Sequence, residues 1–400
     1  ERGLLPDIPY EKLENNNTLT TIGVAHRNMS PLPNEKYFET PFSKTLAKDI
    51  LPTKFPVRFD TNNAPSEVAD TILKDRLGRP DGMCNASLKW AHNKISPNWT
   101  LRKFCRDEYR ANILQNYSGL TLLTDHQVFH GYDPKHRLYG ALKGMEIDTS
   151  IGWTLKQLFN VNKKNDIIDL SPDGKYSWAE NNECAEYARW LFHESKILAS
   201  QGKRYWTTFT ELLKMEKLKP EKMFMPRSFT ANDFNGVLME RYILGEFCAR
   251  AMKWDETIGV GINAYTEFDK HFRYISKHPN MFTGDYKNFD RTLPVCAFDD
   301  IRDLLIEANP HIANEIFVCF DTISRRIQIS GTAMNYVEGG MPSGCLPTAP
   351  LNSKLNDYII FTCYISLCWK NNRTDIASYG MYNRLVSRRF YGDDVMVSCS

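Results

Sequence analysis

The sequence lacks cysteines at the paired spacing that zinc sites and redox motifs need. Its 400 residues include ten cysteines, but they are scattered, with no Cys-x-x-Cys and no Cys/His cluster. This argues against structural zinc and gives no support to a disulfide framework. We therefore interpret the cysteines as small apolar core residues of a protein from a reducing compartment.

Long apolar runs are also missing. The longest extends from about Tyr358 to Trp369 and is interrupted by Thr362 and Ser366, whereas a membrane-spanning helix needs about 20 apolar residues. The N-terminus carries no apolar leader either. The sequence therefore predicts a buried helix in this region, no transmembrane segment, and a cytoplasmic location.

An excess of either charge is absent, because 50 Lys and Arg stand against 48 Asp and Glu. This excludes a polycation that binds through its global charge. The positive residues are nevertheless concentrated in two windows, with six against two acids at 89–110 and seven against three at 203–227. Basic residues interleaved with aromatics, as at 89–110, suit a surface that follows a nucleic-acid backbone. A helix face anchored by core aromatics is the alternative.

Apolar residues make up 42% of the chain and aromatics 12%, enough for a large core. The first 65 residues are rich in Pro, Asn and Thr and predict an extended strap. After Gly284 the pattern becomes regular, and Thr292 as N-cap with Pro294 in the first turn predicts a helix start. The expected elements are a strand at 282–286, helices at 295–308, 312–323 and 350–369, a Gly-rich loop at 339–344, and a hairpin at 389–397.

Three short motifs point to chemistry when they are taken together. The first places Asp285 and Asp290 five positions apart at a strand end, the second runs from Ser343 to Asn352 as S-G-x-x-x-T-x-x-x-N, and the third is Tyr-Gly-Asp-Asp at 391–394. Each alone is typical of ordinary turns and helix caps. Their order and their separations of about 50 residues favour one shared site.

Extending a nucleic-acid strand fits this set of residues. A 3′-hydroxyl must attack the α-phosphorus of a nucleoside triphosphate, and two divalent ions can activate the attacking oxygen and stabilise the leaving one. Such ions take hard carboxylate ligands together with water and phosphate oxygens. Asp285 and Asp393 on adjacent strands would supply two carboxylates, and Gly392 would allow a tight turn beside the primer end.

The three motifs resemble motifs A, B and C in the palm of viral RNA-dependent RNA polymerases. The fuller strings at 340–345 and 390–394 are similar to those of the picornavirus-like branch, particularly its dicistrovirus-like and iflavirus-like members. Upstream, Thr149-Ser150-Ile151-Gly152-Trp153 resembles motif G, with Thr154 where Pro is usual. The stretch from Lys214 to Arg227 resembles motif F, with Met215 where Asp is usual.

The resemblance implies an α/β (α+β) right-hand polymerase with fingers, a palm and a small antiparallel palm sheet backed by the three helices. The chain starts at Glu1 and stops at Ser400, which we interpret as a C-terminally truncated piece without the thumb. The expected parts are an N-terminal strap or fingertips at 1–65, fingers at 66–235, palm at 236–322, a return to the fingers at 323–341, and palm again at 342–400.

The resemblance also implies roles for individual residues. Catalysis and the binding of two Mg²⁺ ions, with Mn²⁺ as a substitute, fall to Asp285, Asp393 and Asp394. Nucleotide binding falls to Asp290, Ser343, Gly344, Thr348, Asn352, Lys214, Lys222 and Arg227. Contact with the RNA template falls to Thr149, Ser150, Gly152, Tyr391 and Gly392.

The implied partners are an RNA template and primer, nucleoside triphosphates, a protein primer, and other replication proteins of the same polyprotein. The implied location is the host cytoplasm, at membrane-associated replication complexes. Such an enzyme would copy a positive-strand RNA genome by transferring ribonucleoside monophosphates to an RNA 3′-hydroxyl.

Three other interpretations compete with this one. A reverse transcriptase also carries a tyrosine and two aspartates on a hairpin, but the short carboxylate of Asp290 suits hydrogen bonding to a ribose 2′-hydroxyl. A catalytically silent RNA-binding module would be free to lose a carboxylate, and none is missing. A hydrolase with Ser343 or Cys345 as nucleophile would need a histidine nearby in the sequence, which is absent.

Overall fold

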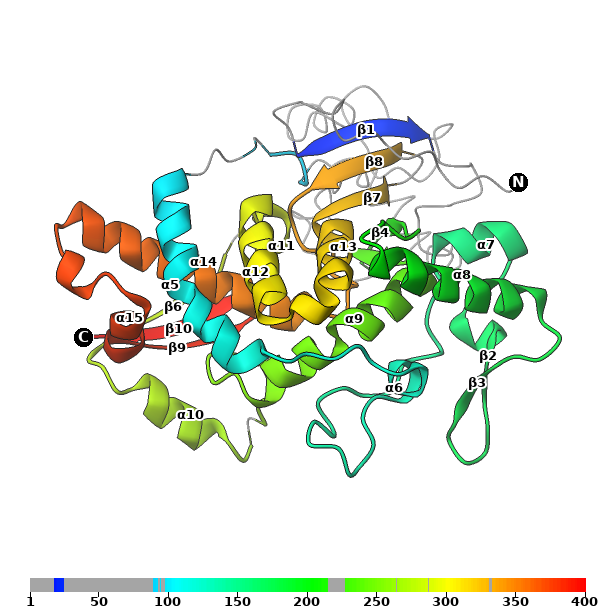
Figure 1. The fold of residues 1–400 in the computed structure, drawn as a ribbon, viewed down its shortest axis with the longest axis horizontal. Helices are drawn as coiled ribbons and strands as arrows, with labels where there is room; N and C mark the ends of the chain where they lie inside the picture. Colours follow the sequence, from blue (N-terminus) through cyan, green and yellow to red (C-terminus); the bar gives the residue numbers. More distant parts are fainter. Residues whose placement is uncertain are drawn as a thin grey trace, which may run out of the picture.

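The computed structural model describes residues 18–24, 89–92, 94, 98–214, 227–263, 265–286, 288–330 and 333–400. Within these residues the chain forms a five-stranded sheet, a three-stranded sheet and a two-stranded hairpin, surrounded by helices (Figure 1). The helices are α5 (Trp99–Tyr117), α6 (Asp125–His130), α7 (Trp153–Phe159), α8 (Glu183–Ser200), α9 (Phe234–Lys253), α10 (Phe268–Ile275), α11 (Phe289–Thr292), α12 (Val295–Ala308), α13 (Ala313–Ser324), α14 (Thr348–Lys370) and α15 (Tyr379–Leu385). No helix among these residues is long and apolar enough to cross a membrane.

The three-stranded sheet carries the acidic motifs at one edge. Its strands are β6 (Asn280–Gly284), β9 (Val386–Tyr391) and β10 (Asp394–Cys399), in the antiparallel order β6-β10-β9. The expected hairpin is therefore present, and the strand predicted at 282–286 begins and ends two residues earlier. The inward face of the sheet buries Val395, Val397 and Phe390.

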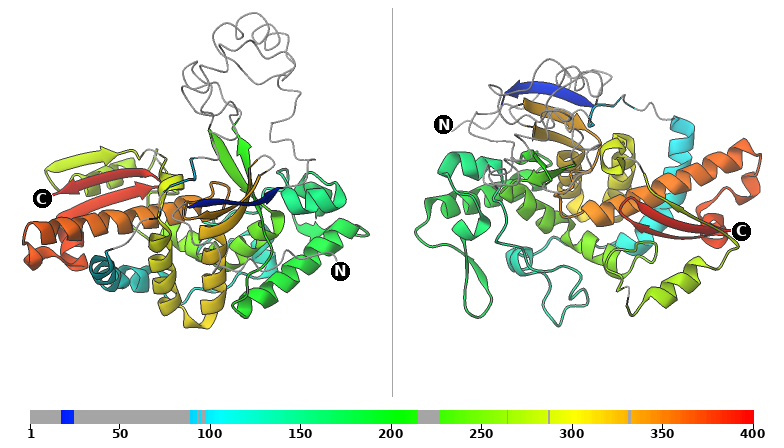
Figure 2. Two further views of the ribbon diagram at one scale, coloured as in Figure 1. Left: turned by 90° about the horizontal axis from the view of Figure 1, so that it is seen from above. Right: turned by 180° about the vertical axis from the view of Figure 1, so that it is seen from behind.

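Of the three helices that the sequence suggested as the backing of this sheet, the one predicted at 350–369 packs on it, together with two others. Helix α14 lies along the hairpin (Figure 2), and α15 and α10 also contact it. Helix α12 instead packs mainly against α5 and α13. The apolar spacing at 295–308 and 312–323 predicted the helices themselves, but not which surface their apolar faces would cover.

The five-stranded sheet joins distant parts of the chain. Its order is β1-β8-β7-β4-β5, comprising β1 (Leu19–Val24), β8 (Ala333–Glu338), β7 (Arg325–Ser330), β4 (Phe209–Leu213) and β5 (Ser228–Asn232). β7 pairs with β4 in parallel, and the other neighbours are antiparallel. The segment predicted to return to the fingers thus forms two central strands, and β1 adds an edge strand from the N-terminal region. Strands β2 (Ile168–Leu170) and β3 (Tyr176–Trp178) form the separate hairpin.

The start of α12 corrects one detail of the sequence analysis. Pro294 occupies the N-cap position of α12, whereas Thr292 ends the short helix α11 and donates its hydroxyl hydrogen to the Asn288 carbonyl at 3.2 Å. A proline disfavours helical backbone at the residue before it, and Leu293 indeed has a non-helical ψ of 120°. The helix could therefore not run through Leu293, and Thr292 could not cap it.

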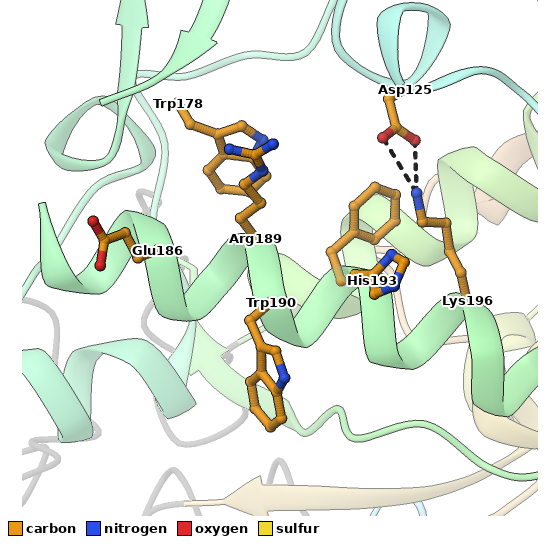
Figure 3. A pocket seen from close by; sticks show the side chains of 8 residues that line it. Asp125, Trp178, Glu186, Arg189, Trp190, His193 and Lys196 are labelled. Carbon is orange, nitrogen blue, oxygen red and sulfur yellow. Dashed lines mark hydrogen bonds and ion pairs between the residues drawn. The ribbon is translucent and has the colours of Figure 1, made fainter. Parts of the chain in front are cut away.

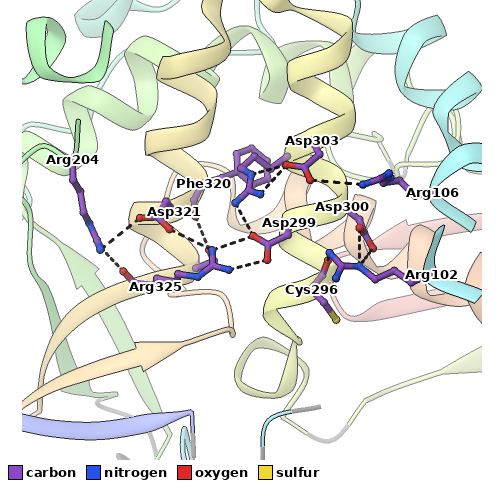
Figure 4. Close-up of polar contacts among 12 residues, drawn as sticks. Arg102, Arg106, Arg204, Cys296, Asp299, Asp300, Asp303, Phe320, Asp321 and Arg325 are labelled. Carbon is purple, nitrogen blue, oxygen red and sulfur yellow. Dashed lines mark hydrogen bonds and ion pairs between the residues drawn. The ribbon is translucent and has the colours of Figure 1, made fainter. Parts of the chain in front are cut away.

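The basic and aromatic stretch at 89–110 proves to contain a helix-packing face. On α5, Arg102 donates to both Asp300 carboxylate oxygens at 2.9 Å, Arg106 lies 3.9 Å from Asp303, and Arg110 pairs with Glu307. These acids stand on consecutive turns of α12, and Figure 4 shows the first two, Asp300 and Asp303. The structure therefore supports the helix-face alternative for these arginines rather than a surface that follows nucleic acid.

Candidate active site

Three carboxylates lie at one edge of the three-stranded sheet. Asp285 directly follows β6, whose Gly284 is paired with Val395 of β10. Asp393 lies in the turn, and Asp394 is the first residue of β10, where it is paired with Tyr391. Because β6 is antiparallel to β10, its end and the start of β10 lie at the same edge. All three carboxylates are exposed.

The conformation of the turn at 391–394 depends on its glycine. Gly392 has a φ of 64°, a left-handed conformation that side chains with a Cβ rarely adopt. A Cβ there would meet no heavy atom within 4 Å, so the requirement is conformational and not steric. Tyr391 beside it is exposed. The turn therefore presents Tyr391 and the acidic side chains of Asp393 and Asp394 to solvent, while the backbone of Gly392 is buried.

The donor set can hold divalent ions only with help from other ligands. Among the described residues, no three Asp, Glu, His or Cys side chains are grouped closely enough to hold a metal ion by themselves. Mg²⁺ commonly keeps several waters and uses one or two protein carboxylates plus substrate phosphate oxygens. Exposed carboxylates at adjacent strand ends fit that chemistry.

Asp290 and Asn352 are brought together beside this edge. The Asn352 side-chain amide donates to Asp290 Oδ1 at 2.6 Å, although 62 positions separate them in sequence. Burial raises the pKa of Asp290, the hydrogen bond from Asn352 opposes that shift, and the negative charge of Asp393 adds to it. Asn352 Oδ1 is buried and has no partner within the described part of the chain. One acceptor thus remains available next to the carboxylate.

Two further residues of α14 hold the acidic turn, and the sequence analysis missed both. Ser353 Oγ accepts a hydrogen bond from the Gly392 amide at 2.8 Å, and Asn356 Nδ2 donates to the carbonyls of Gly392 and Asp393 at 3.1 and 3.4 Å. Tyr286 also donates to Asn356 Oδ1 at 3.0 Å. A sequence signal existed, because residues at helical spacing after Asn352 share one face.

The Ser-Gly loop lies against β5. Ser343 Oγ accepts from the Thr230 amide at 3.0 Å, and a Cβ on Gly344 would lie 2.2 Å from the Thr230 carbonyl oxygen. Thr348 donates to the carbonyls of Pro342 and Cys345 at 3.1 and 2.8 Å, which closes the loop at the start of α14. The structure thus gives Thr348 partners inside the loop, whereas Asn352 reaches Asp290.

Glu240 of α9 also binds the Ser-Gly loop, and the sequence analysis did not identify it. Its carboxylate accepts from the Leu346 amide at 2.8 Å and from Asn232 Nδ2 at 2.7 Å. Burial raises the pKa of Glu240 from 4.5 to about 7, because desolvation outweighs its hydrogen bonds with Cys345, Leu346 and Asn232. This carboxyl group therefore titrates near neutral pH in the folded chain.

This shift predicts a pH dependence of stability. Between about pH 4.5 and 7 the folded state keeps a proton that the unfolded state has lost, so the free energy of unfolding falls by about 3 kcal/mol across that window. In Glu240→Gln this contribution to the slope should disappear and the slope should become shallower, because an amide does not titrate. Urea unfolding at pH 5, 6 and 7.5 measures the slope. The exposed Glu180→Gln is the control and should keep it; an unchanged slope in Glu240→Gln would disprove the assignment.

The predicted phosphate-binding residues are only partly described. Lys214 and Arg227 flank the connection between β4 and β5, and the Lys214 amide donates to the Arg227 carbonyl at 2.8 Å. Lys222 lies outside the described residues. The charge of Lys214 acts to lower the pKa of Asp290, so this lysine lies within electrostatic range of the site.

The segment predicted to contact template is held away from the carboxylates. Gly152, with a φ of 91°, precedes α7, and a Cβ there would lie 2.5 Å from Asp233 Oδ1. Asp233 accepts from the Thr154 hydroxyl at 2.5 Å. Thr149 accepts from Lys164 Nζ at 2.7 Å, and Ser150 forms an isolated bridge with Lys163. Figure 1 shows α7 well separated from the β9–β10 hairpin.

Comparisons with known proteins identify the family. Residues 160–400 match the family described as viral RNA-dependent RNA polymerase. The chain belongs to this family. It is 54% identical over 398 residues to "Polyprotein-FSD" of Solenopsis invicta virus 3, which covers 100% of the chain but 12% of that polyprotein. It is also 29% identical over 201 residues to the RNA1 polyprotein of Satsuma dwarf virus, covering 47% of the chain and 10% of that protein.

A solved structure supports the fold. The "Sicinivirus 3Dpol RNA dependent RNA polymerase" superposes with a TM-score of 0.61 at 20% identity, covering 77% of this chain and 59% of that one. The predicted family and the right-hand polymerase fold with fingers and palm are thereby confirmed. The chain spans about an eighth of the polyprotein from Solenopsis invicta virus 3.

Cys345 in the Ser-Gly loop of this chain does not have the environment of a cysteine nucleophile. Cys345 is buried, and desolvation together with the charge of Glu240 raises the pKa of its thiol well above the ordinary value. A reactive cysteine instead needs a lowered pKa and access to solvent. The hydrolase interpretation therefore finds no support.

A hollow lined mainly by residues of α8 is separate from the candidate site. It has a volume of about 430 Å³, and none of the predicted site residues lines it (Figure 3). Lys196 forms an ion pair with Asp125 at 2.9 Å in its lining. The lining residues are Asp125, Trp178, Glu186, Arg189, Trp190, Phe192, His193 and Lys196.

Proposed function

We propose that this chain catalyses the template-directed transfer of ribonucleoside monophosphates from nucleoside triphosphates to an RNA 3′-hydroxyl. The family membership supports the reaction class. The Asn352–Asp290 hydrogen bond beside the acidic strand ends is the main support for a ribonucleotide substrate rather than a deoxyribonucleotide. The pair presents a carboxylate and a free amide oxygen, both acceptors for sugar hydroxyl groups.

Asp285 and Asp393 would hold two divalent cations, Mg²⁺ or Mn²⁺, with Asp394 as an alternate ligand. When bound, such ions activate the attacking hydroxyl and stabilise the developing charge on phosphate. The chain itself contributes positioning, because α14 anchors the turn of Asp393 through Ser353 and Asn356. Rate enhancement then comes from orientation and electrostatics, without a covalent enzyme intermediate.

The remaining residues fall into two groups in this proposal. The phosphates of the incoming nucleotide would meet Lys214, Lys222 and Arg227. Its ribose would meet Asp290, Ser343, Gly344, Thr348 and Asn352. The template and primer strands would contact Thr149, Ser150, Gly152, Tyr391 and Gly392.

The proposed division into parts keeps the fingers at 66–235 with the strap at 1–65, palm at 236–322 and 342–400, and a return to the fingers at 323–341. Because the relatives are polyproteins, we expect other products of such a polyprotein, including a protein primer, as partners. We place this activity in the host cytoplasm, at membrane-associated replication complexes.

Asp290→Ala should weaken the preference for ribonucleotides over deoxyribonucleotides by about 10- to 100-fold, since one hydrogen bond to a charged acceptor contributes roughly 1.5–3 kcal/mol. Single-nucleotide incorporation on a primed RNA template with Mg²⁺ or Mn²⁺ measures this ratio. The proposal predicts that the loss falls on ribonucleotide incorporation.

Asp269→Ala is the matched control, because Asp269 is exposed on α10 and pairs with Arg273. It should keep the wild-type sugar preference. Equal discrimination in Asp290→Ala and wild type would refute the sugar-binding role. A wild-type chain that binds primed RNA but never extends it would favour the silent-module alternative, and extension with deoxyribonucleotides alone would favour reverse transcription.

A further inference from the structure

One stretch of α14, next to the candidate site, buries an unusual run of polar side chains. Asn352, Ser353, Lys354, Asn356 and Asp357 are all at most 2% exposed. Three of them contact the acidic motifs, as described above. Lys354 and Asp357 have another set of partners, and the proposed catalysis does not yet use them.

Lys354 and Asp357 belong to a buried cluster with two positive and two negative side chains. Arg388 Nε donates to Asp357 Oδ1 at 2.6 Å, and Lys354 Nζ forms an ion pair with Asp255. Side-chain exposure is at most 1% for all four. Neutral groups complete the cluster, since Asp357 and Asp255 also accept from Tyr109, Tyr117 and Thr257.

The Arg388–Asp357 pair joins two elements that converge on the acidic turn. Arg388 is on β9, four residues before Gly392, and Asp357 follows Asn356 on α14. The pair therefore connects the same two elements as the Ser353–Gly392 and Asn356–Gly392 hydrogen bonds. Any sliding of β9 along α14 would separate Arg388 from Asp357 and would also move the Gly392 amide away from Ser353.

A buried ion pair often stabilises a fold no better than a well-packed apolar pair. It does provide geometric specificity, because the planar guanidinium and the carboxylate bind in only a few relative orientations. An apolar pair at the same place could fill the volume without fixing how far β9 is shifted along the helix.

We propose that the Arg388–Asp357 pair, balanced by Lys354–Asp255, is a positioning clamp that fixes the turn bearing Asp393 against α14. This inference rests on the proposed function only for its consequence for catalysis. The clamp itself is a statement about the geometry of the turn, and it can be tested without nucleotide.

The test uses the 400-residue chain with Asp357→Leu and Arg388→Met combined. The double variant removes one charge of each sign and leaves the Lys354–Asp255 pair neutral, so the thermal midpoint should stay within about 5 °C of wild type. Hydrogen exchange of the Gly392 amide should become about tenfold faster or more, because the turn opens locally. Mn²⁺ affinity, followed by electron paramagnetic resonance, should fall about fivefold as the carboxylates lose their fixed spacing.

Arg102→Met combined with Asp300→Leu is the matched control, since this pair joins α5 to α12 and reaches α14 through the hydrogen bond from Tyr358 to Asp300, but does not bond to the hairpin. It should leave Gly392 exchange and Mn²⁺ affinity at wild-type values. If the Asp357/Arg388 double variant does not fold, Arg388→Lys keeps the charge but loses the planar donor, and it should still accelerate Gly392 exchange.

Wild-type exchange and Mn²⁺ affinity in a folded Asp357/Arg388 variant would overturn the clamp, as would wild-type exchange in Arg388→Lys. A loss confined to Mn²⁺ affinity, with Gly392 exchange unchanged, would also overturn it. If the wild-type chain never extends RNA but the variants show faster exchange, the proposed function fails while the clamp stands.

Discussion

An Asp393→Asn chain is expected to extend a primed RNA template at least about 1000-fold more slowly than wild type, a loss of roughly 4 kcal/mol or more in transition-state stabilisation. The physical reason is that an amide is a poor ligand for a hard divalent ion. Single-turnover extension with Mg²⁺ measures the rate. RNA binding, measured by fluorescence anisotropy, should remain within about threefold, since one exposed carboxylate among many charges contributes little to it.

Asp375→Asn is the control for this experiment. Asp375 is exposed and pairs with Arg373 in the loop after α14, so its loss should leave extension unchanged. Extension by Asp393→Asn at a rate near that of wild type would remove Asp393 from the metal site. A loss of RNA binding equal to the loss of extension would indicate damage to the fold instead.

The second large effect is expected for Gly344→Ala. The added Cβ would lie 2.2 Å from the Thr230 carbonyl oxygen and 3.1 Å from the Ala231 Cα, both backbone atoms of β5. The loop must then move away from β5, which breaks the hydrogen bond between Ser343 and the Thr230 amide. We expect a stability loss of about 2–4 kcal/mol and at least about 100-fold slower extension.

Gly380→Ala provides a matched comparison, because a Cβ at Gly380 in α15 meets nothing within 4 Å. Alanine in a helix is favoured over glycine, so this variant should be as stable as wild type or more stable by up to about 1 kcal/mol. Urea unfolding of both variants gives the comparison. Equal stability for the two would mean that the Ser-Gly loop does not need its close contact with β5.

The elements that were easiest to predict are those with strong local patterns. The hairpin at the Tyr-Gly-Asp-Asp motif, the helices α12 and α13, and the long helix α14 all follow from turn chemistry and apolar spacing. Where local signals competed, the prediction was wrong, as at Thr292, where a proline two residues later restricts Leu293. The arginines at 102–110 could not be assigned from sequence, because their acidic partners on α12 are about 200 residues away.

The candidate site divides in the same way. Asp285, Asp290, Asn352 and Asp393 could be proposed from motif spacing, although the sequence could not show that Asn352 donates to Asp290. Glu240, Ser353 and Asp357 were missed, because a polar residue within a helix has the same local pattern whether it is buried or exposed. Only its packing partners reveal that it supports the candidate site.

The sequence by itself determined the family of this chain, because three motifs in fixed order encode local turns and helix starts that few other folds combine. It also determined which carboxylates are candidates for metal binding. The tertiary structure alone decided which buried groups hold them: α14 brings Ser353 and Asn356 to the acidic turn, and Asp357 to Arg388. Such contacts depend on how β9 and α14 pack, and packing geometry arises only when distant segments of the chain come together.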